Sequence, residues 1–258
     1  MEYQYSKKDL NQLKQAQSEK HIMQQYGISF CTIENEEYPM AISSLKGMPP
    51  VLYYKGDIKI VNQHKNVAVI GSREASQSGL KWARETGGIV AQRGLNLVNG
   101  LALGCDTESL KGALEVGGKC IAILPCGLDQ IYPNSNRKLA EEILKTGGCL
   151  LSEYPIGTRP EKYRYVERDR LQSGISQGVL VVEAKEKSGT MHTVEYAVKQ
   201  SKRLACYHSR LMELSSGNRY LEDTGKARIL KKKEDLEAFL NDILKEEIYE
   251  QLSFGNIY

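Results

Sequence analysis

The sequence lacks the features that mark several large classes of protein. No apolar run approaches the roughly 20 residues of a membrane-spanning helix, so we expect no membrane association. Residues 1–20 are polar and of mixed charge, unlike a secretory signal. None of the six cysteines forms a C-x-x-C pair, and several lie in apolar runs. We therefore predict reduced, buried thiols, a cytoplasmic location and no metal site.

Neither strong charge nor a dinucleotide-binding fingerprint is present. The net charge is +3 over 258 residues, so nucleic-acid binding can be argued only from local clusters of charge. The G-x-G-x-x-G fingerprint is absent because Arg73 and Ser76 occupy the later glycine positions. The sequence therefore predicts neither a nicotinamide nor a flavin, and it indicates no other cofactor.

What the sequence does contain is a regular alternation of strand-like and helix-like segments between residues 66 and 230. Apolar runs predict strands at residues 67–70, 95–98, 120–124, 149–152, 178–182 and 204–207. Helical patterns lie at residues 78–93, 107–115, 136–145, 168–173 and 191–200. Such alternation indicates an α/β fold of the Rossmann-like, doubly wound type, with a mainly parallel sheet of six or seven strands.

The segments on either side do not continue this alternation of strands and helices. We predict an N-terminal helical segment at 1–28, a small extension at 29–65 packed on the main domain, the Rossmann-like domain at 66–232, and a C-terminal helix at 233–258. The last helix carries an apolar stripe that includes Leu236, Phe239 and Leu240. Self-association through this stripe and packing of the helix on its own domain are both open.

Two turns have the residues of a phosphate site. Gly71, Ser72 and Arg73 directly follow a strand and precede a helix, where unpaired N–H groups suit an anion. An ordinary turn with a solvated arginine explains the same residues. Ser188, Gly189 and Thr190 open a later helix in the same way, and two such helix ends along one sheet edge could hold two phosphates of a chain.

Other loops that follow strands add further candidates. Asn99 and Gly100 begin a loop whose glycines permit close approach of a ligand or of the neighbouring loop. Asp106 ends that loop, and we expect it to cap the next helix. Gly127 follows the third strand, and we expect it to take a special backbone angle at the ligand edge.

Arginines and tyrosines alternate between residues 163 and 171. Arg164, Arg168 and Arg170 lie close to Tyr163 and Tyr165, which suits phosphate contact combined with base stacking. The alternative is a helix start in which neighbouring acids, among them Asp169, neutralise the arginines. Residue types and spacing offer no nucleophile–base pair, so we expect a protein that is not an enzyme, and His192 is expected to be a packing residue.

These motifs, taken in order, resemble the DprA/Smf family of DNA-processing proteins, which belongs to the wider Rossmann-like SLOG superfamily. The resemblance spans residues 38–230 and rests on many ordered matches: Tyr38-Pro39, Pro50 to Gly56, Gly71-Ser72-Arg73, Gly100 to Asp106, Tyr132-Pro133, Leu151-Ser152-Glu153, Arg168 to Leu171, Val182-Glu183-Ala184, Ser188-Gly189-Thr190 and Ser216-Gly217-Asn218. The chain is similar to a short form of the family without its C-terminal winged helix.

The resemblance implies a cytoplasmic, homodimeric protein that binds single-stranded DNA along a basic groove, loads a RecA-type recombinase or works with another protein partner, and protects DNA in natural transformation. It places Arg73, Arg168 and Arg170 at the family's arginine motifs, with Asp169 where an asparagine is usual. The predicted nucleic-acid or phosphate site comprises Gly71, Ser72, Arg73, Asn99, Gly100, Gly127, Arg164, Arg168, Arg170, Ser188, Gly189 and Thr190.

Two other functions use the same phosphate-binding turns. One is a nucleotide-binding sensor that signals to a partner. The other is a phosphoribohydrolase, similar to the LOG enzymes of the same superfamily, which splits a base from a ribose phosphate. That enzyme needs a glutamate one turn into the second helix, and the nearest candidate, Glu195, lies five residues after Thr190 instead of three.

Overall fold

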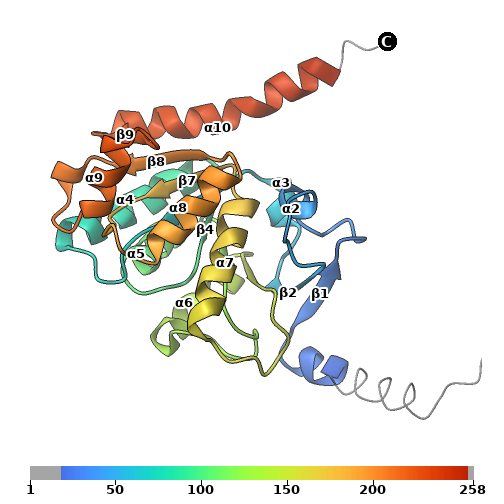
Figure 1. The fold of residues 1–258 in the computed structure, drawn as a ribbon. Helices are drawn as coiled ribbons and strands as arrows, with labels where there is room; N and C mark the ends of the chain where they lie inside the picture. Colours follow the sequence, from blue (N-terminus) through green and yellow to red (C-terminus); the bar gives the residue numbers. More distant parts are fainter. Residues whose placement is uncertain (1–18, 255–258) are drawn as a thin grey trace, which may run out of the picture.

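The computed structural model describes residues 19–254, with side chains up to residue 245. Of the predicted helical segment at 1–28, only its end falls inside these limits, and residues 19–25 are helical. The rest of that prediction lies outside the described residues. Within them, all strands belong to a single sheet with helices on both faces (Figure 1).

The sheet of the described part has nine strands in the order β1-β2-β6-β5-β4-β3-β7-β8-β9. The strands are β1 (Ser29–Thr32), β2 (Val51–Gly56), β3 (Asn66–Ile70), β4 (Asn96–Asn99), β5 (Cys120–Ile123), β6 (Cys149–Ser152), β7 (Gly178–Val181), β8 (Arg203–Tyr207) and β9 (Arg228–Leu230). All pairings from β3 to β9 are parallel, which confirms the predicted α/β, doubly wound fold. The strand pattern in the sequence did not reveal β9.

Helices cover both faces because successive strand residues point to opposite sides. The helices are α2 (Met40–Ser43), α3 (Ile60–Gln63), α4 (Gln77–Gln92), α5 (Cys105–Glu115), α6 (Arg137–Lys145), α7 (Lys162–Ile175), α8 (Thr190–Lys199), α9 (Ser216–Asp223) and α10 (Lys233–Phe254). On β3, Val67 belongs to the buried cluster that includes residues of α4, α5, α6 and α10, whereas Ala68 belongs to the cluster on the opposite face, with residues of α2, α3, α7, α8 and α9. The fully apolar strands of the parallel sheet are buried on both faces for this reason.

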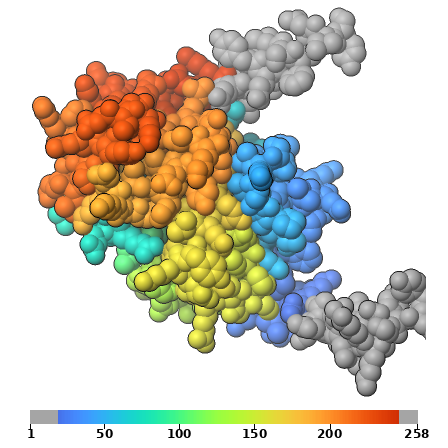
Figure 2. Space-filling view, in the orientation of Figure 1, coloured from blue at the N-terminus to red at the C-terminus, as the bar shows by residue number. Residues whose placement is uncertain are grey.

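The extension at 29–65 joins the sheet directly. β2 pairs antiparallel with β6, and β1 pairs antiparallel with β2, so the two strands form one edge of the sheet. Figure 2 shows this blue segment beside the yellow surface of α7, and Arg170 of α7 donates a hydrogen bond to the carbonyl of Gly47. The sequence predicted packing of the extension but not its strand pairing, and the division of the chain at residues 65 and 232 stays a prediction.

The C-terminal helix packs on the body of its own chain. Leu236, Phe239, Leu240 and Ile243 are buried in the core on the α4 face of the sheet. Their stripe is thus covered within one chain, so it does not argue for self-association. None of the helices among the described residues is both long and apolar enough to cross a bilayer.

The order of the strands determines where a ligand can reach the sheet. The chain runs outward from β3 through β4 and β5 to β6, then returns to the other side of β3 with β7, β8 and β9. The connections therefore diverge between the carboxyl ends of β3 and β7, and ligands of doubly wound proteins bind at such a point. The two candidate turns, residues 71–73 and 188–190, follow these two strands.

Candidate nucleic-acid interface

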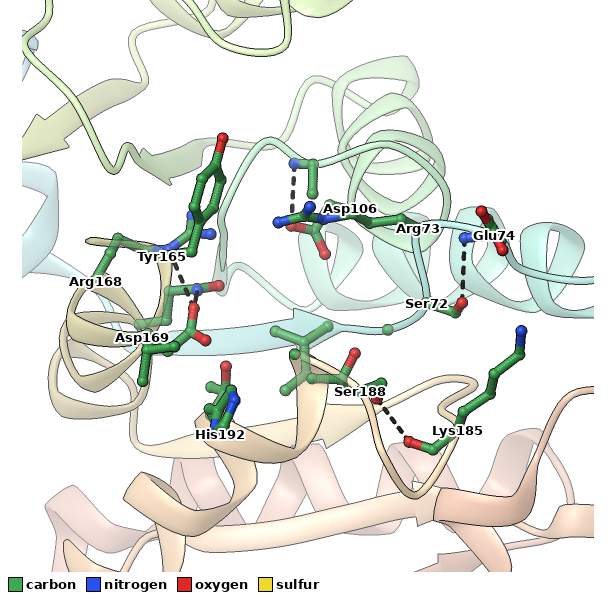
Figure 3. A pocket seen from close by; sticks show the side chains of 18 of the residues that line it. Ser72, Arg73, Glu74, Asp106, Tyr165, Arg168, Asp169, Lys185, Ser188 and His192 are labelled. Atoms are coloured by element: carbon green, nitrogen blue, oxygen red, sulfur yellow. Dashed lines mark hydrogen bonds and ion pairs between the residues drawn. The ribbon is translucent and has the colours of Figure 1, made fainter. Parts of the chain in front are cut away.

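A cleft of about 480 Å³ lies at this divergence of β3 and β7. Its walls come from the turn after β3, the loop before α5, the helix α7 and the start of α8 (Figure 3). Residues from four parts of the chain therefore face one space. They are Ile70, Gly71, Ser72, Arg73, Glu74, Ala102, Asp106, Lys162, Tyr165, Val166, Arg168, Asp169, Gln172, Lys185, Ser188, Gly189, Thr190, His192 and Thr193.

Arg73 is an exposed cation of this cleft. Its guanidinium carbon lies 4.8 Å from the ring centroid of Tyr165, a cation–π arrangement that directs the side chain over the cleft (Figure 3). The Tyr165 ring in turn meets Tyr132 edge to face, with ring centroids 6.3 Å apart. Because Tyr132 is 48% exposed, an aromatic surface continues from the cleft to the solvent.

The turn that carries Arg73 is held by close backbone packing. The N–H of Ser72 donates to the carbonyl of Glu183 at 2.7 Å, and the carbonyl of Ser72 accepts from Cys105 at 3.1 Å. Gly104 has a φ of +75°, and a Cβ there would lie 2.2 Å from the Ser72 carbonyl oxygen. Glycine is needed here both for the positive φ and for the lack of space beside the carbonyl oxygen. The sequence left open whether this loop approaches a ligand or the neighbouring loop, and the structure shows that it packs against the turn after β3.

The start of α8 is the open helix end of the cleft. Gly189 occupies the N-cap position without a side-chain cap, and it lines the cleft together with Ser188 and Thr190. The N–H groups of Met191 and His192 donate to the carbonyls of Ser188 and Gly189 at 3.1 and 3.0 Å, so within the described residues the N–H of Thr190 is the group of this first turn without a backbone partner. The N-terminal end of the helix dipole adds positive potential there. Lys185, which is exposed, lines the same wall, and its carbonyl accepts from the Ser188 hydroxyl at 2.6 Å.

The prediction of a second open helix end, at the turn after β3, was wrong. α4 begins only at Gln77, and Ser76 caps it by accepting from the N–H of Gly79. The buried carboxylate of Glu183 accepts from the N–H of Ser76 at 2.7 Å and from its hydroxyl at 2.8 Å. An acidic side chain of the protein therefore already occupies the anion position of this helix.

Asp106 does not cap α5, contrary to expectation. Gly104 is the N-cap residue, and Asp106 lies within the first turn and is buried. Its carboxylate accepts from the N–H groups of Gly100 and Ala102 at 3.0 and 3.2 Å, so it holds the preceding loop. Burial raises the pKa of Asp106, and the charge of Arg168 partly opposes that effect.

Arg168 is buried instead of being presented to solvent. Its guanidinium packs on Gly100, donates to the carbonyl of Ile123, and pairs with the Asp169 carboxylate at 3.2 Å. Only 5% of the Arg168 side chain is exposed, so the arginine lines the inner wall of the cleft with its Nε and Nη1 donors engaged by Asp169 and Ile123. Its first effect is to balance two buried carboxylates, which are Asp106 and Asp169.

Asp169 is buried in surroundings that disfavour its ionised form. Its pKa is raised to about 6, and burial is the largest cause. The nearby Asp106 also raises the pKa, whereas Arg168 and His192 lower it. The folded state thus favours the protonated form. The contribution of this group to stability is full below the unfolded pKa near 4 and is lost as pH rises through about 6.

We expect Asp169→Asn to stabilise the protein at neutral pH. The amide carries no charge to desolvate, so the gain in free energy of unfolding should be on the order of 2 kcal/mol above pH 7 and should shrink toward zero near pH 4. Urea unfolding at a series of pH values measures it, with Glu195→Gln on the exposed face of α8 as control. A difference that stays constant with pH would contradict the assignment.

Five predicted site residues do not line the cleft, and Gly100, on which Arg168 packs, is one of them. Arg170 is held by both carboxylate oxygens of Glu153 at 2.7 and 2.6 Å. The guanidinium of Arg164 lies over the rings of Tyr154 and Tyr163, and it pairs with Glu161. Asn99 and Gly127 do not line the cleft either.

The Asn99 side chain is buried and holds its own loop. Its amide donates to the carbonyl of Asp106, and its oxygen accepts from the N–H of Leu101. Gly127 is also buried, and its φ is not positive, so the predicted special angle was wrong. A Cβ at Gly127 would lie 2.5 Å from the carbonyl oxygen of Pro155, which explains why only glycine fits.

The residue pattern did not predict a place in the site for Lys162, Lys185, Gln172 or Tyr132. Lys185 follows β7 closely, so the rule applied to the other strand ends could have found it. Lys162 was hidden because the helix was predicted at 168–173, whereas α7 begins at Lys162. Gln172 gave no signal, and Tyr132 entered only through the Tyr132-Pro133 match to the family, without a role of its own.

Two other expectations concern chemistry. All six cysteines are buried and unpaired, which confirms the prediction of buried thiols. Among the described residues, no three His, Cys, Asp or Glu side chains gather as metal ligands would. Glu195, the acid that a phosphoribohydrolase would use, is exposed on α8 and does not line the cleft, so the site does not favour that enzyme.

Comparison with known sequences identifies relatives of the chain. The sequence model of the family described as DNA recombination-mediator protein A matches residues 29–241. Protein Smf of Synechocystis sp. is 38% identical over 177 residues, which make up 67% of this chain and 44% of that protein. The chain thus spans less than half the length of this curated relative.

Two solved structures share the fold and about a third of the aligned residues. DNA processing protein A (DprA) from Streptococcus pneumoniae matches with a TM-score of 0.76 and 32% identity, over 85% of this chain and 77% of that one. DNA processing protein A from Helicobacter pylori, described for its unique single-stranded DNA binding mode, matches with a TM-score of 0.75 and 32% identity, over 86% of this chain and 98% of that one.

Proposed function

The chain belongs to the family of DNA recombination-mediator protein A, and on this premise we propose that it binds single-stranded DNA in the cleft between β3 and β7 and acts in DNA recombination. The observation that carries the proposal is the meeting of three exposed cations, Arg73, Lys162 and Lys185, around the open end of α8. The single-stranded DNA binding of the Helicobacter pylori relative supports the choice of ligand.

The cleft offers a separate contact for each part of a strand. Phosphates meet the cations and the N–H of Thr190 at the start of α8, contacts that do not depend on base sequence. Bases stack on Tyr165 and Tyr132, whose rings form the aromatic surface at the mouth. Duplex DNA keeps its bases paired and stacked inside, so it cannot use that aromatic surface.

A binding panel tests the proposal. Fluorescence anisotropy with labelled single-stranded DNA, duplex DNA and mononucleotides, at about 50 and 200 mM salt, should show tightest binding to the single strand. Affinity should fall as salt rises, because bound phosphates release counterions. Equal binding of duplex and single strand, or tight binding of a mononucleotide alone, would point to another ligand, such as that of a nucleotide sensor.

The proposal includes a role without catalysis, in the cytoplasm, together with a RecA-type recombinase and as a homodimer. The description of the family as a recombination mediator supports the recombinase partner. The apolar stripe of α10 does not support the homodimer, because it is covered by its own chain. Light scattering over micromolar concentrations should give twice the chain mass. A single-chain mass at every concentration would contradict the homodimer and leave DNA binding unaffected.

A further inference from the structure

The turn that carries Arg73 is an arch, residues 72–76, between two anchor points. At one end, the N–H of Ser72 donates to the main-chain carbonyl of Glu183 at 2.7 Å. At the other end, the N–H and the hydroxyl of Ser76 donate to the Glu183 carboxylate at 2.7 and 2.8 Å. A single residue that follows β7 therefore holds both ends of the arch.

Between these anchors, little else fixes the position of Arg73. Within the described residues, its guanidinium lies over the ring of Tyr165 and makes no hydrogen bond or ion pair. The arch adds one internal hydrogen bond, from the N–H of Glu74 to the Ser72 hydroxyl at 3.1 Å (Figure 3). A long side chain loses conformational freedom when it binds, and the loss is larger when its backbone is not already fixed. The anchors therefore determine how favourable a contact of Arg73 is.

The Glu183 carboxylate is also joined to the other side of the cleft. Its Oε1 accepts from the N–H of Leu214 at 2.8 Å, just before α9. The hydroxyl of Ser216, at the start of α9, accepts from the N–H of Glu186 at 3.1 Å. Glu186 adjoins Lys185, which lines the cleft. One buried carboxylate therefore connects the arch to the loop that carries a second cation of the cleft.

The three donors that meet this carboxylate require two acceptor oxygens. Oε2 accepts from the N–H of Ser76, and Oε1 accepts from the Ser76 hydroxyl and from the N–H of Leu214. A glutamine has the same shape, but its NH2 group would face the Ser76 N–H in one orientation and the Leu214 N–H in the other. Because Glu183 is 0% exposed, water does not supply the missing acceptor.

We propose that Glu183 is a positioning residue for DNA binding, because its carboxylate fixes the arch and thereby the place of Arg73 at the cleft. The proposal rests on the proposed function, since it concerns the contact of Arg73 with a phosphate. Its expected sign is opposite to that of simple electrostatics. Loss of a negative charge near a phosphate strengthens binding by Coulomb attraction alone, whereas release of the arch weakens it.

A double-variant cycle tests this assignment. Fluorescence anisotropy at pH 7.5 gives the affinity of the parent, Glu183→Gln, Arg73→Ala and the double variant for labelled oligothymidylate of about 16 residues. We expect Glu183→Gln to bind about tenfold more weakly than the parent, the scale of ordering one long side chain on binding. In the Arg73→Ala background the same change should cost less than about twofold, because the arch then carries no cation. The salt dependence of Glu183→Gln should fall toward that of Arg73→Ala.

A second variant and a matched control separate positioning from folding. Ser76→Ala removes the hydroxyl that donates to Glu183, so it should weaken binding about threefold, again with no further loss in the Arg73→Ala background. Thr86→Val removes a buried hydrogen bond on α4, between the Thr86 and Tyr207 hydroxyls at 2.7 Å, and neither residue lines the cleft. This control should bind within about twofold of the parent. Thermal melts establish that each variant is folded at the temperature of the titration.

Three results would overturn the proposal and leave the proposed function intact. The first is a folded Glu183→Gln that binds like the parent, or a folded Ser76→Ala that does so if Glu183→Gln does not fold. The second is a loss that multiplies with that of Arg73→Ala, and the third is an equal loss in Thr86→Val. If the parent does not bind the oligonucleotide, or if Arg73→Ala binds as the parent does, the proposed function itself fails.

Discussion

Replacing Arg73 by alanine is expected to weaken binding of single-stranded DNA by about 1–3 kcal/mol, which is roughly 5- to 150-fold at 25 °C. Arg73 is an exposed cation whose guanidinium is directed over the cleft by Tyr165. The alanine variant loses one charge-assisted contact to phosphate, and its binding therefore releases one counterion fewer. The slope of log affinity against log salt should therefore fall by about one. Fluorescence anisotropy over a range of salt concentrations measures both quantities.

A matched control separates this contact from a general loss of positive charge. Arg228 is also exposed, on β9, and its partner Asp242 lies on α10, away from the residues of the cleft. Arg228→Ala should change the affinity by less than about twofold. Arg73→Lys should fall between the parent and the alanine variant, because an ammonium keeps the charge but cannot make the two parallel bonds of a guanidinium. If Arg73→Ala binds as the parent does, the strand does not pass through this cleft.

The second large effect is expected on folding. Arg168→Ala should lower the free energy of unfolding by about 3–5 kcal/mol, because it leaves the buried carboxylates of Asp106 and Asp169 without their counter-charge. The loss should appear as a decrease in melting temperature of about 10 °C, given roughly 2–4 °C per kcal/mol for a protein of this size. Any weaker binding of DNA by this variant would follow from the damaged cleft wall.

A double variant shows whether the charge balance is the cause. In Arg168→Met with Asp169→Asn, one of the two orphaned charges is also removed, so the double variant should be more stable than Arg168→Met alone. The coupling between the two sites should exceed the few tenths of a kcal/mol found for independent sites. Urea unfolding at pH 7.5 provides the four free energies. If the two effects are additive, or if the free energy of unfolding of Arg168→Met lies within 1 kcal/mol of that of the parent, the ion pair does not support the cleft.

Local patterns determined the fold class and the position of the cleft. The β-branched runs and the helical patterns between them specify a parallel, doubly wound sheet, since each is decided by neighbours in the sequence. The turns at 71–73 and 188–190 could be placed on one sheet edge because parallel strands all end on the same side. Both turns do line one cleft, as the reasoning from spacing required.

Only the tertiary structure decided what each charged side chain does. Arg73, Arg164, Arg168 and Arg170 look alike in sequence, yet Arg73 is exposed while Glu153, Glu161 and Asp169 are paired with the other three. Likewise, the Glu183 carboxylate accepts a hydrogen bond at the N-terminus of α4, although Glu183 lies 107 residues beyond Ser76. No local sequence pattern predicts this contact. Burial and pairing depend on which elements pack together across the sheet, so they are properties of the folded chain. The sequence by itself determined where a ligand can approach, and the packing determined which groups remain free to bind it.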